Sequence, residues 1–164
     1  MVPVVIEQLR SAGPYEGWLR HSVHLIKYQG EPSRIGHLAR IALPALQDID
    51  DPGALVPVPL HKQRIRERGF NQSAMLAQAL SELSGLELWD GMGRVRDTAH
   101  QVGLSGPERA ANVAGAFEVR DMPSVVPRRV VLIDDVFTTG ATLEACANVL
   151  LKHGAGSVSA VTMC

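Results

Sequence analysis

The sequence predicts an α/β protein built on a doubly wound parallel sheet, with a small N-terminal helical hood. Two observations predict this class. Short apolar runs rich in β-branched residues, which suit strands buried on both faces, alternate with amphipathic helical patterns. Charged clusters directly follow two of these runs, and open α/β sheets bind their ligands at the carboxyl ends of their strands.

Length and composition fit a single domain. The chain has 164 residues, of which 46% are hydrophobic and 20% charged, and its net charge is −1. We expect one domain over residues 1–164, with the hood in 1–50 and the α/β core in 54–164. The near-neutral charge provides no global electrostatic field that would attract nucleic acid.

The sequence predicts neither a membrane span nor a leader. No apolar run approaches the roughly 18 residues that a membrane span requires. The first residues, Met1–Leu9, contain Glu7 and lack the basic start of a signal peptide. Two cysteines cannot by themselves build a disulfide framework or a zinc site. We therefore expect a cytoplasmic protein with no membrane partner.

The first third of the chain predicts one short strand and two helices. Val2–Leu9 is the strand candidate. Helical patterns begin at Pro14 and at Pro32, and part of region 91–115 is expected to join these helices in the hood. Pro44 lacks an N–H group and clashes with the preceding turn, so we expect the second helix to kink or restart there.

A second buried strand begins at Ala54 and is followed by a cationic stretch. We expect the strand to end by Val58, because Pro57 cannot donate to a central ladder. His61–Gln72 reads H-K-Q-R-I-R-E-R-G-F-N-Q, and Asn71 is expected to cap the next helix. The cations are Lys62, Arg64, Arg66 and Arg68. The forked N–H donors of a guanidinium group suit phosphate oxygens, so we expect a diphosphate-binding loop. The alternatives are a solvated charged turn and a contact with a DNA backbone.

The most informative stretch is 130–142, which reads V-V-L-I-D-D-V-F-T-T-G-A-T. Val130–Ile133 predicts a buried strand, and Asp134 and Asp135 follow at its carboxyl end. A hydroxyl-rich turn around Gly140 then leads into a helix. Backbone N–H groups and the positive helix end attract phosphate, while the carboxylates suit the vicinal hydroxyls of a ribose. The alternative is an Asp pair that only caps and solvates the turn.

Further strands are predicted at Leu86–Trp89, Ala116–Val119 and Ser157–Thr162. The irregular region 91–115 between the first two carries several polar donors, namely Arg94, Arg96, His100, Gln101 and Arg109. Gly103 and Gly106 can act as hinges, so region 91–115 is a candidate mobile loop. The alternative is a surface loop in which Ser105–Glu108 begins a short helix.

The 130–142 stretch resembles, along its whole length, the phosphoribosyl pyrophosphate (PRPP) motif of type I phosphoribosyltransferases. The resemblance implies that fold, with Asp134 and Asp135 as catalytic residues that hold the ribose. It also implies a 5-phosphate loop made of Phe137, Thr138, Thr139, Gly140, Ala141 and Thr142. Type I enzymes close a mobile loop over PRPP, and region 91–115 resembles that loop in position, so the resemblance implies a lid over the site. Within this region, Arg109 is a third catalytic candidate.

A second pattern, V-P-V-P-L-H-x-x-R-x-R-x-R-G-F-N-Q with Lys27-Tyr28 upstream, resembles the ComF family of predicted phosphoribosyltransferases linked to competence and DNA uptake. The resemblance runs from about Tyr15 to the last residue. Family members usually begin with a Cys-rich zinc-binding segment, whereas this sequence has no C-x-x-C pattern. The sequence either starts after that segment or has lost it, so the segment's function does not carry over.

These resemblances imply transfer of a phosphoribosyl group from PRPP to a base, or the reverse step. The expected ligands are PRPP or a nucleoside 5′-monophosphate, with Mg²⁺ held by the substrate and by Asp134 and Asp135. The alternative is a non-catalytic module that senses PRPP or a nucleotide and serves DNA uptake through protein partners. No residue predicts the acceptor base or the oligomeric state, so both stay open.

Overall fold

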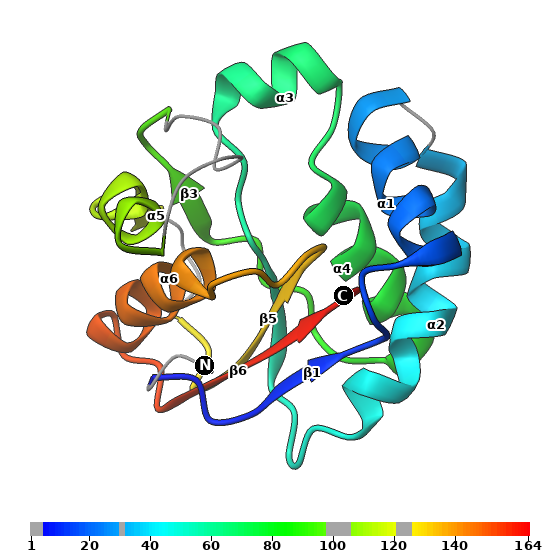
Figure 1. The fold of residues 1–164 in the computed structure, drawn as a ribbon. Helices are drawn as coiled ribbons and strands as arrows, with labels where there is room; N and C mark the ends of the chain where they lie inside the picture. The colour runs from blue at the N-terminus through cyan, green and yellow to red at the C-terminus, as the bar shows by residue number, and fades with distance from the viewer. Residues whose placement is uncertain (1–4, 30–31, 98–105, 121–125) are drawn as a thin grey trace.

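A four-stranded parallel sheet forms the centre of the computed structural model, which describes residues 5–29, 32–97, 106–120 and 126–164 (Figure 1). The strand order is β1–β6–β5–β2, and every neighbouring pair is parallel. The strands are β1 (Leu9–Ser11), β2 (Ala54–Pro57), β5 (Arg129–Asp134) and β6 (Ser157–Thr162). The α/β class and the parallel sheet predicted from the sequence are therefore confirmed.

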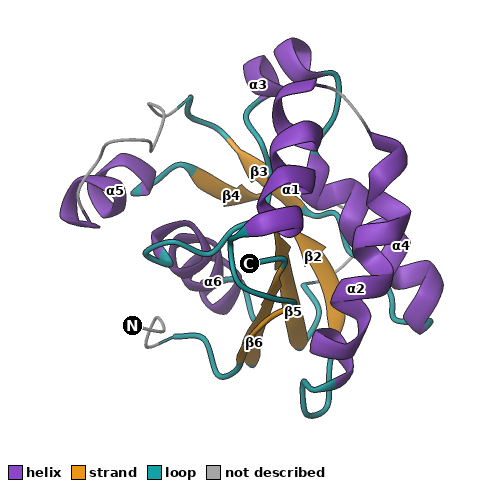
Figure 2. Ribbon diagram, turned by 45° about the vertical axis from the view of Figure 1, so that its right-hand side comes forward, coloured by secondary structure: helices purple, strands orange, loops and turns teal. Residues whose placement is uncertain are grey.

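Helices cover both faces of this sheet, as a doubly wound fold requires (Figure 2). One face carries α1 (Gly17–Gln29), the 3-10 turn η1 (Pro32–Arg34), α2 (Ile35–Gln47) and α4 (Gln72–Ser84). The other face carries α6 (Ala141–Lys152), with α5 (Gly106–Val113) packed against it. The seven-residue helix α3 (Lys62–Arg68) lies beyond the carboxyl ends of β2 and β5, at the top of Figure 1. Along the described ranges, no helix has both the length and the apolarity that crossing a bilayer demands.

The two faces of the sheet are built by alternation along each strand. In β5, Val130 and Leu132 pack with α6, while Val131 and Ile133 pack toward α2 and α4. Successive strand side chains point to opposite faces, and both faces are covered here, so the strand is apolar at every interior position. This explains why the unbroken run at 130–133 predicted the strand correctly.

A small antiparallel sheet lies outside the main one. It pairs β3 (Met92–Arg94) with β4 (Phe117–Val119). The strand predicted at Ala116–Val119 is therefore present, but it pairs locally and does not extend the main sheet. The strand predicted at Leu86–Trp89 is reduced to one parallel bridge between Leu88 and Leu55 at the edge of β2.

Three expectations for the N-terminal part need correction. The first strand is Leu9–Ser11, not Val2–Leu9, because its ladder with β6 starts at Leu9; residues 1–4 lie outside the described ranges. Helix α2 does not restart at Pro44 but continues to Gln47. Its buried apolar face, which includes Ala42 and Leu46, spans the proline and keeps the helix on the core. The expected joint hood is not formed, because Met92 and Val113 pack in the core cluster of α6, whereas α1 and α2 pack in the cluster on the other face of the sheet.

Candidate functional site

Two carboxylates stand at the carboxyl end of β5. Asp134 is the last residue of this strand and lies opposite Thr162 of β6. Asp135 follows and is only 8% exposed. A buried carboxylate is costly unless hydrogen-bond donors compensate it, so the donors around this pair define the site.

The first turn of α4 supplies those donors. Nε2 of Gln72 donates to Oδ2 of Asp135 at 3.0 Å, and Oγ of Ser73 donates to Oδ1 of Asp134 at 3.0 Å. Asn71 caps the helix as predicted, with its Oδ1 accepting from the backbone N–H of Ser73 at 3.0 Å. The positive end of α4 thus faces the acidic pair, which adds electrostatic stabilisation.

Sequence reasoning missed Gln72 and Ser73. The signal was present, because both directly follow the capping Asn71 within the F-N-Q-S run after the cationic stretch. What the sequence does not show is that this turn packs against residues more than sixty positions later. The pairing depends on the sheet order, which brings the end of β2 beside the end of β5.

The loop from Asp135 makes a sharp turn that leads directly into α6, as the sequence predicts. Gly140 adopts φ = 80° and precedes the first residue of the 12-residue helix α6, so the backbone turns sharply at the helix entry. Thr138 and Thr139 are exposed, and Oγ1 of Thr139 accepts from the N–H of Ala141 at 3.5 Å. The start of the loop is anchored, because the N–H of Phe137 donates to the carbonyl oxygen of Cys164 at 2.5 Å.

The cationic stretch is a helix and not the predicted loop. K-Q-R-I-R-E-R consists almost entirely of strong helix formers, and Gly69 ends the helix with φ = 91°. Residues four apart share a face of a helix, so the four cations form two pairs. Arg64 and Arg68 are half-buried on one side, whereas Lys62 and Arg66 are exposed on the other.

A further cation, Arg94 at the end of β3, lies near both the acidic pair and α3. Its guanidinium sits 5.3 Å from the centre of the Phe117 ring. Burial lowers the pKa of Arg94, nearby Arg64 lowers it further, and Asp134 acts in the opposite direction. Arg64 in turn lies with its Nε 3.7 Å from Oδ1 of Asp97. Arg94 was expected to belong to a lid, but the structure places it in a strand beside Asp134.

Two expectations fall wholly or partly outside the described residues. The central part of the predicted lid, 98–105, is not described, and β3 (Met92–Arg94) lies near the start of the predicted region 91–115. The alternative reading of Ser105–Glu108 as a helix start agrees with α5, which begins at Gly106. Arg109 lies on α5, but its side chain is outside the described part of the chain.

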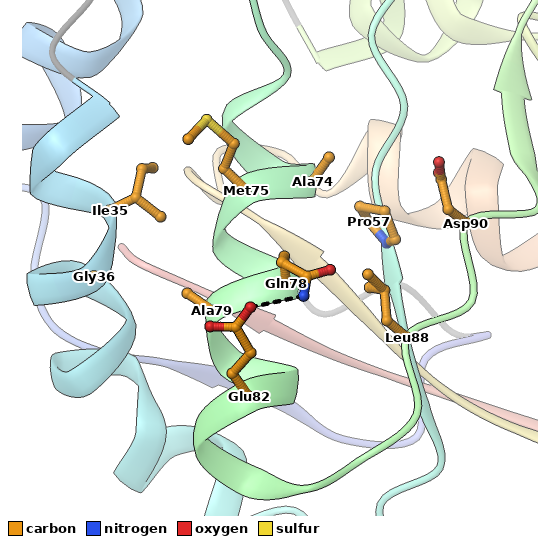
Figure 3. Close-up of a pocket in the computed structure, with 10 residues that line it drawn as sticks. All are labelled: Ile35, Gly36, Pro57, Ala74, Met75, Gln78, Ala79, Glu82, Leu88 and Asp90. Carbon is orange, nitrogen blue, oxygen red and sulfur yellow. Dashed lines mark hydrogen bonds between the residues drawn. The ribbon is translucent and has the colours of Figure 1, made fainter.

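A separate pocket lies along the outer face of α4 (Figure 3). It has a volume of about 490 Å³, and Figure 3 shows Met75 and Ala79 of α4 facing Ile35 of α2, with Leu88 on the opposite side. Its lining is mostly apolar and includes no lysine or arginine. The pocket therefore does not suit a phosphate, and the acidic pair is not part of it.

Comparisons with known proteins identify relatives. No protein-family model matches the chain. DNA utilization protein YhgH of Salmonella typhimurium is 35% identical over 96% of this chain and 72% of its own. Competence protein F of Haemophilus influenzae is 38% identical over 71% of this chain and 55% of its own. Competence protein ComFC of Bacillus subtilis is 31% identical over 98% of this chain and 65% of its own.

Among solved structures, the allosteric regulatory enzyme of purine biosynthesis aligns with 80% of this chain and 26% of its own, at 19% identity and a TM-score of 0.49. A structural similarity of that strength does not show which family the chain belongs to. The sequence relatives show it, because they share more than 30% identity with the chain and the chain spans over two thirds of the YhgH protein. The chain belongs to the ComF family.

Proposed function

We propose that the protein binds PRPP and transfers its phosphoribosyl group between diphosphate and a base. The observation that supports this most is the acidic pair at the end of β5, fixed by α4 and followed directly by the Gly140 turn into α6. This arrangement offers acceptors for two ribose hydroxyls beside a helix end that attracts phosphate. A ribose 5-phosphate group would place its hydroxyls at the carboxylates and its phosphate at the helix end.

The proposed roles follow from position. Asp134 and Asp135 accept hydrogen bonds from the ribose hydroxyls, and each such bond to a charged acceptor contributes about 1.5–3 kcal/mol. The loop from Phe137 to Thr142 binds the 5-phosphate through backbone N–H groups and threonine hydroxyls. Together they fix the sugar, so that the carbon that carries diphosphate is held in place for attack by the base.

Cations around α3 are proposed to neutralise the departing diphosphate. Arg64 and Arg94 are the first candidates, because both are half-buried and lie near Asp134 or Asp97. Arg68 shares the face of Arg64, whereas Lys62 and Arg66 point outward and would reach only a ligand that extends over α3. Preorganised donors at a site of developing negative charge are among the largest contributions to catalysis. Arg109 on α5 stays a catalytic candidate.

The residues present fit a Mg²⁺ ion held partly by the substrate. Within the described ranges, no group of three His, Cys, Asp or Glu side chains could bind a metal without help. Mg²⁺ is commonly bound by one or two carboxylates plus phosphate oxygens, and Asp134 and Asp135 supply the carboxylates. When bound, the ion would offset charge on the diphosphate.

Turnover tests this proposal. The protein is incubated with PRPP, Mg²⁺ and a panel of purine and pyrimidine bases, and diphosphate release is followed. We expect release that depends on one base and is lost in Asp134→Asn/Asp135→Asn. The matched control is Arg129→Ala, at the opposite end of β5, which removes an ion pair with Asp51 and should leave release unchanged. Failure of wild type to release diphosphate with any base would contradict the transferase proposal.

The relatives' names favour a second candidate, a PRPP- or nucleotide-sensing module that serves DNA uptake through protein partners. One relative is named for DNA utilization and two for competence. Such a module keeps the same binding site but needs no acceptor base. Binding of PRPP without diphosphate release across the base panel would favour this candidate over the enzyme.

A further inference from the structure

Gln72 connects two groups of opposite charge in the candidate site. Its Oε1 accepts from Nη1 of Arg68 at 2.5 Å, and its Nε2 donates to Oδ2 of Asp135 at 3.0 Å. Gln72 is 7% exposed and Asp135 is 8% exposed, so the hydrogen bond between them is shielded from water, while Arg68 is half-buried. Ser73, the next residue, is 2% exposed and holds Asp134 in the same way.

The two partners determine which way the amide points. Arginine can only donate and an ionised carboxylate can only accept, so the oxygen of Gln72 faces Arg68 and its nitrogen faces Asp135. A glutamate at this position would accept from Arg68 but repel Asp135. A lysine would donate to Asp135 but repel Arg68. Among side chains of this length, the amide satisfies both neighbours without adding a charge.

We infer that Gln72 is a positioning residue, which orients the Asp135 carboxylate for a ribose hydroxyl and ties that orientation to Arg68 on the cationic helix. The inference rests on the proposed function, because it assumes that the acidic pair binds ribose. It also gives Arg68 a second role. Besides any contact with phosphate, Arg68 acts on the sugar indirectly, because it holds Gln72, which in turn holds Asp135. Gln72 itself touches no ligand in this proposal.

The ligand test compares ribose 5-phosphate with 2-deoxyribose 5-phosphate, which lacks one hydroxyl but keeps the phosphate. Wild type should prefer the ribose form by about tenfold or more, the value of one hydrogen bond to a charged acceptor. Gln72→Glu should reduce this preference to nearly one at about pH 8, because two adjacent carboxylates repel and Asp135 loses its donor. Binding of the deoxy form through the phosphate loop should change little.

Gln78→Glu is the matched control. It is the same substitution on the same helix, but Gln78 is exposed and donates to Glu82 at 2.8 Å, away from the acidic pair. It should keep the wild-type preference. Equal loss of both ligands in Gln72→Glu, with their ratio unchanged, would indicate a merely structural role and overturn the inference. So would a wild-type ratio in Gln72→Glu at about pH 8.

A ligand-free measurement separates failure of this inference from failure of the proposed function. Urea midpoints are compared for Gln72→Glu, Asp135→Asn and the double variant, in which the amide introduced at position 135 can donate to the carboxylate introduced at position 72. The double variant should unfold at a higher urea concentration than the sum of the single effects predicts. If the effects of the two substitutions on the urea midpoint simply add, the Gln72–Asp135 link is overturned, whether or not ligand binds. If the effects are coupled but wild type does not bind ribose 5-phosphate, the proposed function fails, and the positioning role fails with it.

Discussion

The hydroxyl of Ser73 donates a hydrogen bond to Oδ1 of Asp134 at 3.0 Å, although 61 residues separate the two in the chain. The same oxygen also accepts from the backbone N–H of Asp135 at 2.9 Å. Two donors on one oxygen fix the plane of the carboxylate. The first turn of α4 thereby determines how the last residue of β5 is presented, before any ligand arrives.

Removing that hydroxyl should weaken both the fold and the site. We expect Ser73→Ala to lower the free energy of unfolding by about 1.5–3 kcal/mol, the range for a hydrogen bond to a charged group. It should also reduce stabilisation by ribose 5-phosphate. Urea unfolding with and without ligand measures both effects.

Ser81→Ala on the same helix is the control, since Ser81 donates to the neutral carbonyl of Leu86 at 2.6 Å. It should cost less, about 0.5–1.5 kcal/mol, and leave ligand stabilisation unchanged. If both variants lose ligand stabilisation equally, the link between Ser73 and the acidic pair has no role in binding.

The two faces of α3 should differ in their effect on PRPP. We expect Arg64→Ala to weaken PRPP far more than a nucleoside 5′-monophosphate, because only PRPP carries the diphosphate. Arg66→Ala should have a smaller effect, since Arg66 is exposed on the opposite side of the helix. Isothermal titration with both ligands checks this order. Equal losses for PRPP and the monophosphate in Arg64→Ala would contradict the diphosphate assignment.

The same variants test the DNA alternative. If α3 binds a DNA backbone, Arg66→Ala should reduce DNA affinity and lower the salt dependence by about one unit of slope per lost contact. Our account expects no change in DNA affinity for Arg64→Ala. A salt-dependent loss in that variant would favour DNA as the ligand of this helix.

A side chain at position 140, in the turn before α6, should destabilise the protein. Gly140 has φ = 80°, and an L-residue in this conformation costs about 1–2 kcal/mol. Gly140→Ala should therefore destabilise the protein by about that amount and also weaken phosphate-containing ligands. Gly85→Ala is the matched control, with φ = 75° at the end of α4 and open space around its Cβ position. It should cost similar stability and leave ligand binding intact; a parallel loss of ligand binding would indicate a general effect.

Much of the fold is readable from local pattern. β5 and β6 were predicted within one residue because a strand covered on both faces is apolar throughout, and α6 because Leu143 and Leu150 recur at helical spacing. The cationic stretch was misjudged for a related reason. Charge suggested a ligand loop, whereas the helix propensity of K-Q-R-I-R-E-R determined the backbone.

The contacts that complete the site could not be predicted in the same way. Gln72 meets Asp135 across 63 residues, and Arg94 reaches the neighbourhood of Asp134 only because β3 pairs with β4. Neither contact can be predicted from the periodicity of apolar residues in the sequence. Residue type and spacing therefore predicted the position of the acidic pair at the end of β5 and the turn at Gly140, while the donors that orient the pair depended on tertiary structure.

Cys146, buried on α6, makes the fold sensitive to alkaline pH. Burial raises its pKa well above the ordinary 9.0, and Asp134 raises it further, while Arg94 opposes this. Its contribution is fully present below pH 9.0, where the thiol is protonated in both states. Above that pH the unfolded chain loses the proton first, so stability falls by up to about 1.4 kcal/mol per pH unit until the folded pKa is reached. Cys146→Ala should flatten this fall in urea unfolding series; an unchanged slope would contradict the assignment.

The central claim, that the acidic pair and the Gly140 turn hold a ribose 5-phosphate group, is tested most directly by thermal unfolding with PRPP and Mg²⁺. Wild type should be stabilised, by about 2.7 kcal/mol when PRPP is at about 100 times its Kd. Asp134→Asn/Asp135→Asn should fold but lose this stabilisation, while Arg129→Ala, at the other end of β5, should keep it. An unfolding temperature of wild type that does not change at millimolar PRPP would contradict the account.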